Sequence, residues 1–581
     1  MRAEAALLPG ERTALARASL ADALDTGFAD RTTDPRALAR VALMAHMAGR
    51  SEAALALARR VTLAADESDA GVEARRIAEL IVSLERWWRA DPDLAFLPPA
   101  ASAEDSDPVV VLGAAAWVFT RTNLYQPADA DWDELQRMLA RARDGADSWL
   151  GRTGTAAGLA DGIAAALHAA ASAFLTERAD WAAGFLDRLR RAVIRHRLNA
   201  WLPILDMFAG FAAQQLGRFA EARQRLADAI RLLRRDPASP YLPIALATQV
   251  VVWEYLGDER GSRELADIEL ELVAGAWRTT DMIARNTAVH LLGLGLAQRG
   301  DLEGAARLVG LLGPIESQPL VHEDRVRAYE ILAQAALARG DREEAMRIRA
   351  HLTTLYASQS QGGALARLDT LLGAPDADPL RYAEASGVAG ELLRARFTLI
   401  AAAVAGGTRA AALQELAALD SLAFQLRVSG MRVRAVRLFQ TASASTPLTR
   451  RQLEVATLAA VGLTNKEIGT QLHLSPRTVE SHVREALDAL GLERRSQFAG
   501  ARLPVRIGAA ARRATLTMRQ GQVAALVAAG STNAEAAAAL GLSEKTVEKH
   551  VSGLLTALDV GSRAGIAAAV LGAAEGVTVR A

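Results

Sequence analysis

The sequence predicts an all-α protein in which an irregular α-solenoid is followed by two small four-helix domains. Three observations lead to this expectation. Over the first 445 residues, apolar residues recur at intervals of three and four, with breaks at Gly, Asp and Pro, as in successive amphipathic helices. Glycine junctions recur in the same region at nearly constant spacing. The last quarter of the chain contains one long pattern twice, which indicates two copies of one small domain.

The composition predicts a soluble, cytoplasmic protein of several domains. The chain has 581 residues, of which 51% are hydrophobic, so each domain can bury a core. It contains no cysteine, which excludes disulfides and thiolate metal sites and fits a reducing compartment. The first 20 residues lack the unbroken apolar core of a signal peptide, and the best apolar run, residues 109–119, is too short to span a bilayer.

Charge is spread unevenly along the chain. The formal net charge is zero, but residues 446–581 contain 16 Lys and Arg against 11 Asp and Glu, a net +5 that the first 445 residues balance. A basic tail beside an acidic body suits an anionic partner. The chain has three lysines, all in this tail: Lys466, Lys545 and Lys549. Because no Gly-Lys pair exists, a phosphate-binding loop of the GxxxxGK[ST] type is excluded.

The body, residues 1–440, contains repeated helix-pair junctions. The junction glycines Gly217, Gly257, Gly300 and Gly340 are 40, 43 and 40 residues apart, and two outlying junctions lie at Ala48 and Gly406. This spacing is near that of tetratricopeptide and HEAT repeats, in which each helix pair is half-exposed until its neighbours stack on it. We therefore expect a tetratricopeptide-like sensor or interaction domain at 109–440. A Pro-, Ser- and acid-rich stretch, 91–108, separates it from an N-terminal helical segment at 1–90.

The body contains no catalytic, cofactor-binding or metal-ligating constellation. No GxSxG, no dinucleotide fingerprint and no i, i+4 histidine pair occurs in it. We therefore expect no enzyme, no cofactor and no metal site. A short polar link, residues 441–447, leads into the repeated tail.

Each tail copy is interpreted as four helices. Two capping boxes in the first copy recur at matching offsets in the second: Thr449–Gln452 and Thr464–Glu467, then Thr517–Gln520 and Thr532–Glu535. The third helix starts after the N-cap Ser475, and in the second copy after Ser543. A helix, a tight turn and a second capped helix make up the helix-turn-helix plan.

The third helix of each copy has one apolar and one polar face. The apolar stripes are Val479, Val483, Leu487 and Leu490, and Val547, Val551, Leu555 and Leu558. The polar faces carry Arg477, Glu480, Ser481 and Arg484 in the first copy, and Lys545, Glu548, Lys549 and Ser552 in the second. Such a face fits the major groove, where Arg or Lys pairs with guanine and Glu accepts from cytosine. On the polar face alone, an ordinary solvated helix is an equal alternative.

Other residues suit contacts to the DNA backbone. The amides at the capped helix starts, with Ser475 and Thr478 or Ser543 and Thr546, suit phosphate contacts that set the register on DNA. Lys466, on the second helix of the first copy, is a further candidate DNA contact.

The tail resembles the LuxR-type helix-turn-helix. The first copy matches from Leu448 to Ser496, through EVATLAAVGLTNKEIGTQLHLSPRTVESHV, and the second from Leu516 to Arg563. We place the two domains at 446–505 and 514–573. The resemblance implies base reading by Glu480, Ser481 and Arg484, and by Glu548, Lys549 and Ser552. It also implies pairing through the fourth helix, residues 495–503 and 563–571.

The second copy departs from the first at four positions. Ala534 replaces Lys466, Ala536 replaces Ile468, Gln522 replaces Glu454 and Ser552 replaces Arg484. The first copy is therefore expected to be the stronger reader and the second a less stable, auxiliary one. A linker containing Arg502, Arg506, Arg512 and Arg513 would hold them side by side, so that the second copy replaces half of a dimer.

The body resembles the tetratricopeptide-like helical part of large MalT-type LuxR-family regulators, but it lacks their NTPase signature. We therefore expect a sequence-specific transcriptional regulator that binds double-stranded DNA while its body senses an effector or protein partner. RNA polymerase, a small molecule, a protein on the solenoid and a second copy of the chain are candidate partners, and no membrane is. The alternative is an interaction scaffold whose tail is a docking module with little DNA affinity.

Overall fold

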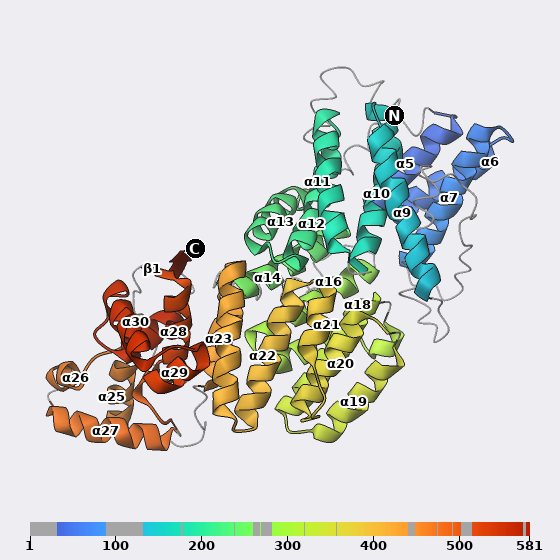
Figure 1. Ribbon diagram of the computed structural model, residues 1–581. Helices are drawn as coiled ribbons and strands as arrows, with labels where there is room; N and C mark the ends of the chain where they lie inside the picture. Colours follow the sequence, from blue (N-terminus) through green and yellow to red (C-terminus); the bar gives the residue numbers. More distant parts are fainter. Residues whose placement is uncertain are drawn as a thin grey trace.

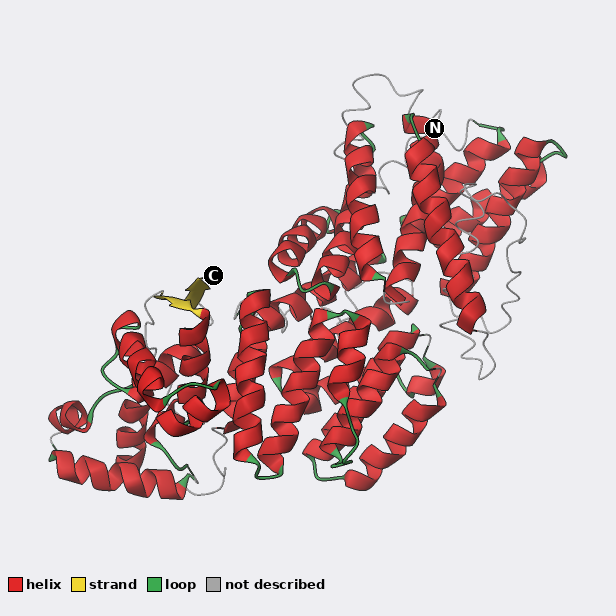
Figure 2. Ribbon diagram, viewed as in Figure 1, coloured by secondary structure: helices red, strands yellow, loops and turns green. Residues whose placement is uncertain are grey.

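The structure is a computed structural model, and helices dominate it (Figures 1 and 2). It describes residues 32–88, 132–175, 178–236, 239–258, 268, 282–318, 320–355, 357–439, 448–472, 474–490, 492–500, 514–572 and 577–580. The predicted linkers 91–108 and 441–447 and the four linker arginines lie outside these ranges. The predicted all-α class is confirmed.

The body is a succession of antiparallel helix hairpins. Its helices are α5 (Pro35–Met47), α6 (Ser51–Ala64), α7 (Asp69–Trp88), α9 (Trp132–Arg152), α10 (Ala156–Leu175), α11 (Ala179–Arg195), η1 (Asn199–Trp201), α12 (Leu202–Gln215), α13 (Phe219–Leu233), α14 (Tyr241–Leu256), α16 (Met282–Arg299), α17 (Leu302–Gly310), η2 (Ile315–Ser317), α18 (His322–Ala338), α19 (Arg342–Thr354), α20 (Gln359–Leu371), α21 (Pro379–Ser386), α22 (Ala389–Ala405), α23 (Arg409–Leu426) and α24 (Gly430–Phe439). No described helix is both long and apolar enough to cross a membrane.

The predicted junctions of the hairpins are confirmed. At each predicted junction a helix is followed by a glycine in the left-handed conformation, which L side chains rarely adopt. These glycines, all with positive φ, are Gly49, Gly217, Gly257, Gly300, Gly340 and Gly407. The more specific assignment of the hairpins as tetratricopeptide-like repeats stays a prediction.

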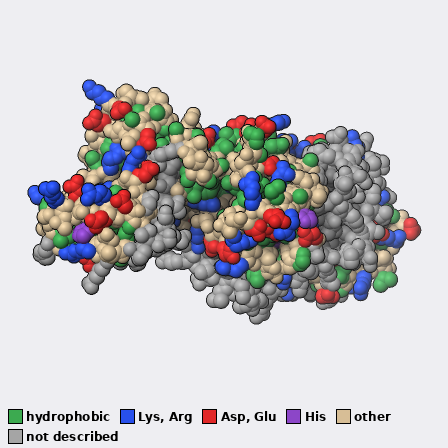
Figure 3. All heavy atoms as spheres, turned by 90° about the horizontal axis from the view of Figure 1, so that it is seen from below, with side chains coloured by type: hydrophobic (Ala, Val, Ile, Leu, Met, Phe, Trp, Pro, Cys, Tyr) green, Lys and Arg blue, Asp and Glu red, His purple; other side chains and the backbone are tan. Residues whose placement is uncertain are grey.

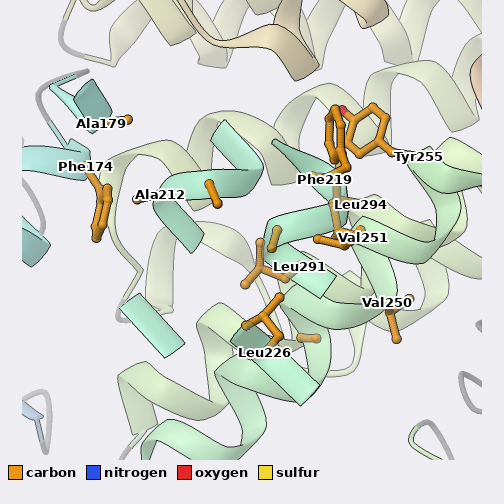
Figure 4. Close-up of a cluster of buried hydrophobic side chains, with 14 of the residues drawn as sticks. Phe174, Ala179, Ala212, Phe219, Leu226, Val250, Val251, Tyr255, Leu291 and Leu294 are labelled. Carbon is orange, nitrogen blue, oxygen red and sulfur yellow. The ribbon is translucent and has the colours of Figure 1, made fainter. Parts of the chain in front are cut away.

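Consecutive hairpins share one hydrophobic core. Figure 4 shows a part of it, in which the rings of Phe219 and Tyr255 lie together, 4.7 Å between centroids, with Leu294 and Val251 beneath them. These side chains come from α13, α14 and α16, and each is buried. The same core continues to the N-terminal helices α5–α7, so residues 32–88 of the segment predicted at 1–90 pack onto the solenoid.

The C-terminal end of the solenoid folds back on its middle. Ser429, at the start of α24, donates a hydrogen bond to the Leu256 carbonyl oxygen (2.7 Å). A buried ion cluster joins α18, α20 and α22, because the Arg367 guanidinium donates to Glu330 (2.7 Å) and Glu391 (2.6 Å). Burial alone would raise the pKa of Glu391, but Arg367 and Arg394 hold that pKa at about 2. A hydrogen bond and buried ion pairs therefore hold the last helices of the solenoid against its middle.

The tail consists of α25 (Arg450–Ala460), α26 (Asn465–Leu472), α27 (Pro476–Ala489), η3 (Arg495–Gly500), β1 (Ala514–Thr517), α28 (Met518–Ala528), α29 (Asn533–Leu540), α30 (Glu544–Ala557), α31 (Arg563–Gly572) and β2 (Val577–Arg580). Two features differ from expectation. The fourth helix of the first copy, expected at 495–503, is the short 3₁₀ helix η3, a form common in short terminal pieces. The strands β1 and β2 were not expected. They pair in parallel, with Ala514 opposite Val577, and contain the β-branched residues that favour strands.

Candidate nucleic-acid interface

The first tail copy, residues 448–500, folds around a core of its own. Val455, Ile468, Val479 and Phe498 are fully buried in it, and they come from α25, α26, α27 and η3. Leu487 and Leu490 of the predicted stripe pack against this core while remaining partly exposed. The amphipathic pattern of α27 therefore turns its polar side outward.

All four predicted capping boxes are present. In the first copy the Thr449 amide donates to Gln452 (2.8 Å) and the Thr464 amide to Glu467 (2.7 Å). In the second copy Thr517 and Thr532 make the same reciprocal bonds with Gln520 and Glu535. These bonds satisfy backbone donors that a helix start leaves unpaired, so they set where each helix begins.

An arginine clamp, not anticipated from the sequence, closes each module identically. Arg495 donates to the Asn465 side chain (2.6 Å) and the Leu463 carbonyl (2.6 Å). In the second copy Arg563 donates to Asn533 (2.8 Å) and to the Ser531 carbonyl (2.5 Å). Burial lowers the pKa of both arginines. The clamp ties the fourth helix to the turn before the second helix, and thereby fixes the helix-turn-helix geometry.

The third helix of the first copy, α27, presents its predicted polar residues to solvent. Arg477, Glu480 and Arg484 are exposed, and Ser481 is half-buried. The Ser475 hydroxyl accepts the Thr478 amide (3.0 Å) as the N-cap, so both residues lie at the exposed start of the helix. Lys466 on α26 is exposed as well. Seen from below, Lys and Arg side chains are interspersed with acidic ones on the lobe containing α26 and α27 (Figure 3).

Glu485 also belongs to this surface, although the sequence interpretation missed it. It accepts hydrogen bonds from Ser481 (2.8 Å) and Gln452 (3.1 Å), and these bonds, led by that of Gln452, lower the pKa of its carboxyl. Its position one turn after Ser481 was the available signal. The carboxylate orients Ser481 and adds a negative charge to this surface.

The third helix of the second copy, α30, is equally accessible. Lys545, Glu548, Lys549 and Ser552 are exposed, Thr546 is half-buried, and Ser543 caps the helix by accepting the Thr546 amide (3.2 Å). Gly553 stands where the first copy has Glu485, so no carboxylate lies beside the basic residues at that position. The two helices thus present different chemistry on the same framework.

The second copy is docked on the solenoid through α28 and α29, which pack against α23. Gln522 of α28 is buried, and its amide donates to the Ser421 hydroxyl and to the Ala417 carbonyl (3.4 Å). Ala536 is fully buried, and the core around it is continuous with the core of the solenoid. We name this contact, Gln522 with Ser421 and Ala417, the docking contact. Figure 1 shows α30 on the side of α28 away from α23.

The two copies also contact each other, through η3 of the first and α31 of the second. Arg494 donates to Glu535 (2.8 Å) and to the Gly530 carbonyl. Burial would raise the pKa of Glu535, but the hydrogen bonds from Arg494 and Thr532 together outweigh burial and hold that pKa at about 2. The side chains of both partners are about 30% exposed.

Both tail copies match a family of known proteins. Residues 446–500 and 514–570 each match the family described as bacterial regulatory proteins, luxR family. The transcriptional regulatory protein LiaR of Bacillus subtilis (strain 168) is 44% identical over 52 residues, which are 9% of this chain and 25% of that protein. The chain thus spans a quarter of the length of this relative. The resemblance of the body to MalT-type regulators is not confirmed.

Proposed function

We propose that this protein is a sequence-specific transcriptional regulator, acting in the cytoplasm, that binds duplex DNA through α27 and α30. The observation that carries the proposal is the accessibility of both reading helices. Each starts at a serine cap, turns its apolar stripe into the module and leaves its Arg, Lys and Glu side chains exposed. The family match of both copies supports DNA binding by the tail.

Specific roles follow from side-chain chemistry. Arg484 and Arg477 suit guanine edges or phosphates, and Glu480 suits the amino group of cytosine. Lys466, at the second helix, suits a backbone phosphate, as do the amides behind Ser475 and Thr478. In the second copy Lys549 and Lys545 take the guanine or phosphate role, Glu548 the cytosine role, and Ser552 a weaker polar contact.

The solenoid is proposed to sense an effector or a protein partner and to transmit its state through α23. The docking contact supports this role, because a shift of α23 would move α28 and with it the whole second copy. Replacing Ser421 with Ala removes one hydrogen-bond partner of Gln522 and is expected to change operator affinity. Gln425→Ala, on an exposed position of the same helix, is the control. Equal affinities for both variants and the natural chain would remove α23 from the proposal.

The rival function is an interaction scaffold whose tail has little DNA affinity. Selection of random duplexes on the full-length chain separates the two. A regulator enriches a defined motif, and its affinity falls steeply with salt because bound phosphates release counterions. Arg484→Ala should weaken this binding, whereas Arg437→Ala, an exposed arginine on α24, should not. Failure to enrich any motif would favour the scaffold.

A further inference from the structure

The contact between the two tail copies is reciprocal. Corresponding residues of the copies are 68 positions apart, as Leu448 and Leu516 show. Ser562 donates to the Gly462 carbonyl (2.8 Å), and Arg494 donates to the Gly530 carbonyl. Residue 494 corresponds to 562, and 462 corresponds to 530. Each copy therefore uses the same two positions to contact the other.

A second pair of contacts is reciprocal in the same way. A Cβ atom on Gly462 would lie 2.6 Å from the Gly565 Cα, and one on Gly530 would lie 3.0 Å from the Gln497 Cγ. Residue 497 corresponds to 565. Both glycines have positive φ, so the turn after the first helix of each copy is placed against the fourth helix of the other. Contacts in which i meets j while j meets i define an isologous, two-fold interface.

Within one chain, this interface covers the fourth helices η3 and α31, through which pairing was expected. η3 and α31 pack directly on each other. Gln497 of η3 is buried, and the turn at Gly530 of the second copy lies against it. The same surface is therefore occupied and not open to the tail of a second chain. At the same time the polar faces of α27 and α30 are exposed together, and neither lies in this contact.

We propose that one chain is a complete internal dimer and that it reads an operator of two unequal, inverted half-sites. This inference rests on the proposed DNA binding and specifies its ligand. Two-fold pairs of helix-turn-helix modules place their reading helices in successive major grooves, about 34 Å or one helical turn apart. In homodimers the half-sites repeat each other. Here the reading residues differ, so the half-sites differ too.

The difference between the half-sites follows from the positions of the basic residues. The first copy places Arg484 nine residues after its N-cap, and the second places Lys549 six residues after its own. Three residues advance about 4.5 Å along a helix, a little more than the 3.4 Å between base pairs. Each half-site can be numbered from the base pair nearest the start of its helix. In this numbering, the guanine contacted by Lys549 should lie about one base pair from the position that Arg484 contacts in its own half-site.

Random-duplex selection with the full-length chain, followed by mass measurement of the complex, tests the inference. We expect one chain on each duplex and a motif with two dissimilar half-sites about ten base pairs apart, centre to centre. Inserting five base pairs between them should lower affinity at least tenfold, because it rotates one half-site to the opposite side of the duplex. Arg484→Ala should relax one half-site and Lys549→Ala the other, and Arg437→Ala neither.

The outcomes are distinct. A single half-site, or two chains on each duplex, would overturn the internal dimer while leaving DNA binding intact. Two identical half-sites would overturn the inequality of the readers. If no duplex binds, the proposed function fails together with the inference. A fourth result, tolerance of the five-base-pair insertion, would show that the copies separate and that the contact does not hold them on DNA.

Discussion

The two tail copies share a fold but not an environment. Leu453, Glu454 and Ala460 of α25 are half-buried, whereas their counterparts in α28, Gly521, Gln522 and Ala528, are buried. Glu454 pairs with Arg451 (2.8 Å) at the surface, while its counterpart Gln522 lies against α23. Several departures of the second copy thus suit docking on the solenoid. They do not by themselves indicate a decayed DNA module.

This comparison explains why a glutamate would be unsuitable at position 522. The Ala417 carbonyl beside it can accept but not donate, so it would repel a carboxylate. Glutamine supplies the required donor. In the first copy Glu454 instead accepts a bond from Arg451 (2.8 Å).

The largest effect is expected from removing a core side chain of the first copy that the second copy lacks. Ile468→Ala should lower the free energy of unfolding of the first copy by about 2–5 kcal/mol, because Ile468 is fully buried in a core that stands alone. Hydrogen exchange of the α26 and α27 amides in the full-length chain measures this. Lys466→Ala, exposed on the same helix, should change it by less than about 0.5 kcal/mol. Equal losses for both variants would contradict the assignment of Ile468 to the core.

The second-largest effect is expected from a substitution in the docking contact, which only the second copy makes. Gln522→Glu should weaken the attachment of α28 to α23 by about 1–3 kcal/mol, because one carboxylate oxygen would face the Ala417 carbonyl oxygen, while Arg519, which donates to Gln522 (3.0 Å), can pair with the other. Hydrogen exchange of α28 would report it. The reverse exchange, Glu454→Gln, should have little effect on α25. Acidification should rescue Gln522→Glu, because protonated glutamic acid can donate as glutamine does. An effect of equal size in both copies would refute the role of docking.

Loss of a basic reading residue should affect the copies unequally. Arg484→Ala and Lys549→Ala should each reduce operator affinity by about 1–3 kcal/mol, with the greater loss for Arg484, since arginine can bind guanine through two bonds. Titration of both variants at one salt concentration provides the comparison. Equal losses would mean that the first copy is not the stronger reader.

The smallest expected effect concerns the contact between Arg494 and Glu535. The ordinary pKa of Glu535 is 4.5 and the folded value is about 2. The stabilisation is therefore complete above about pH 4.5 and is lost as the pH falls toward 2. It should amount to about 1 kcal/mol or less, because the pair is partly exposed. Glu535→Gln, which can keep the capping box, should abolish this pH dependence, as followed by hydrogen exchange of α31.

Glu467→Gln in the first copy is the matched control for that experiment. Glu467 accepts the same capping bonds from Thr464, but Ser562 occupies the position that corresponds to Arg494. The contact between the copies should therefore keep its pH dependence in this variant. Loss of that dependence would show that capping, and not Arg494, causes it.

Much of the local structure could be predicted from residues close together in the chain. The capping boxes at Thr449 and Thr517, the caps Ser475 and Ser543, and the junction glycines act on backbone groups within one turn, so their patterns are legible in sequence. The exposed faces of α27 and α30 followed from helical periodicity. The arginine clamps and Glu485 were missed because their partners or their orientation depend on how helices pack.

The arrangement of the modules was set by contacts between distant residues. Gln522 lies about 100 positions from Ser421, and Gly462 about 100 from Gly565, so no periodicity links them. The small apolar residues of α28 suit burial on every side, but many partners would satisfy them equally. The sequence thus predicted two exposed polar helix faces with unequal residues. Long-range packing decided that one copy rests on α23 and that both meet as a two-fold pair, because such contacts depend on shape complementarity in three dimensions.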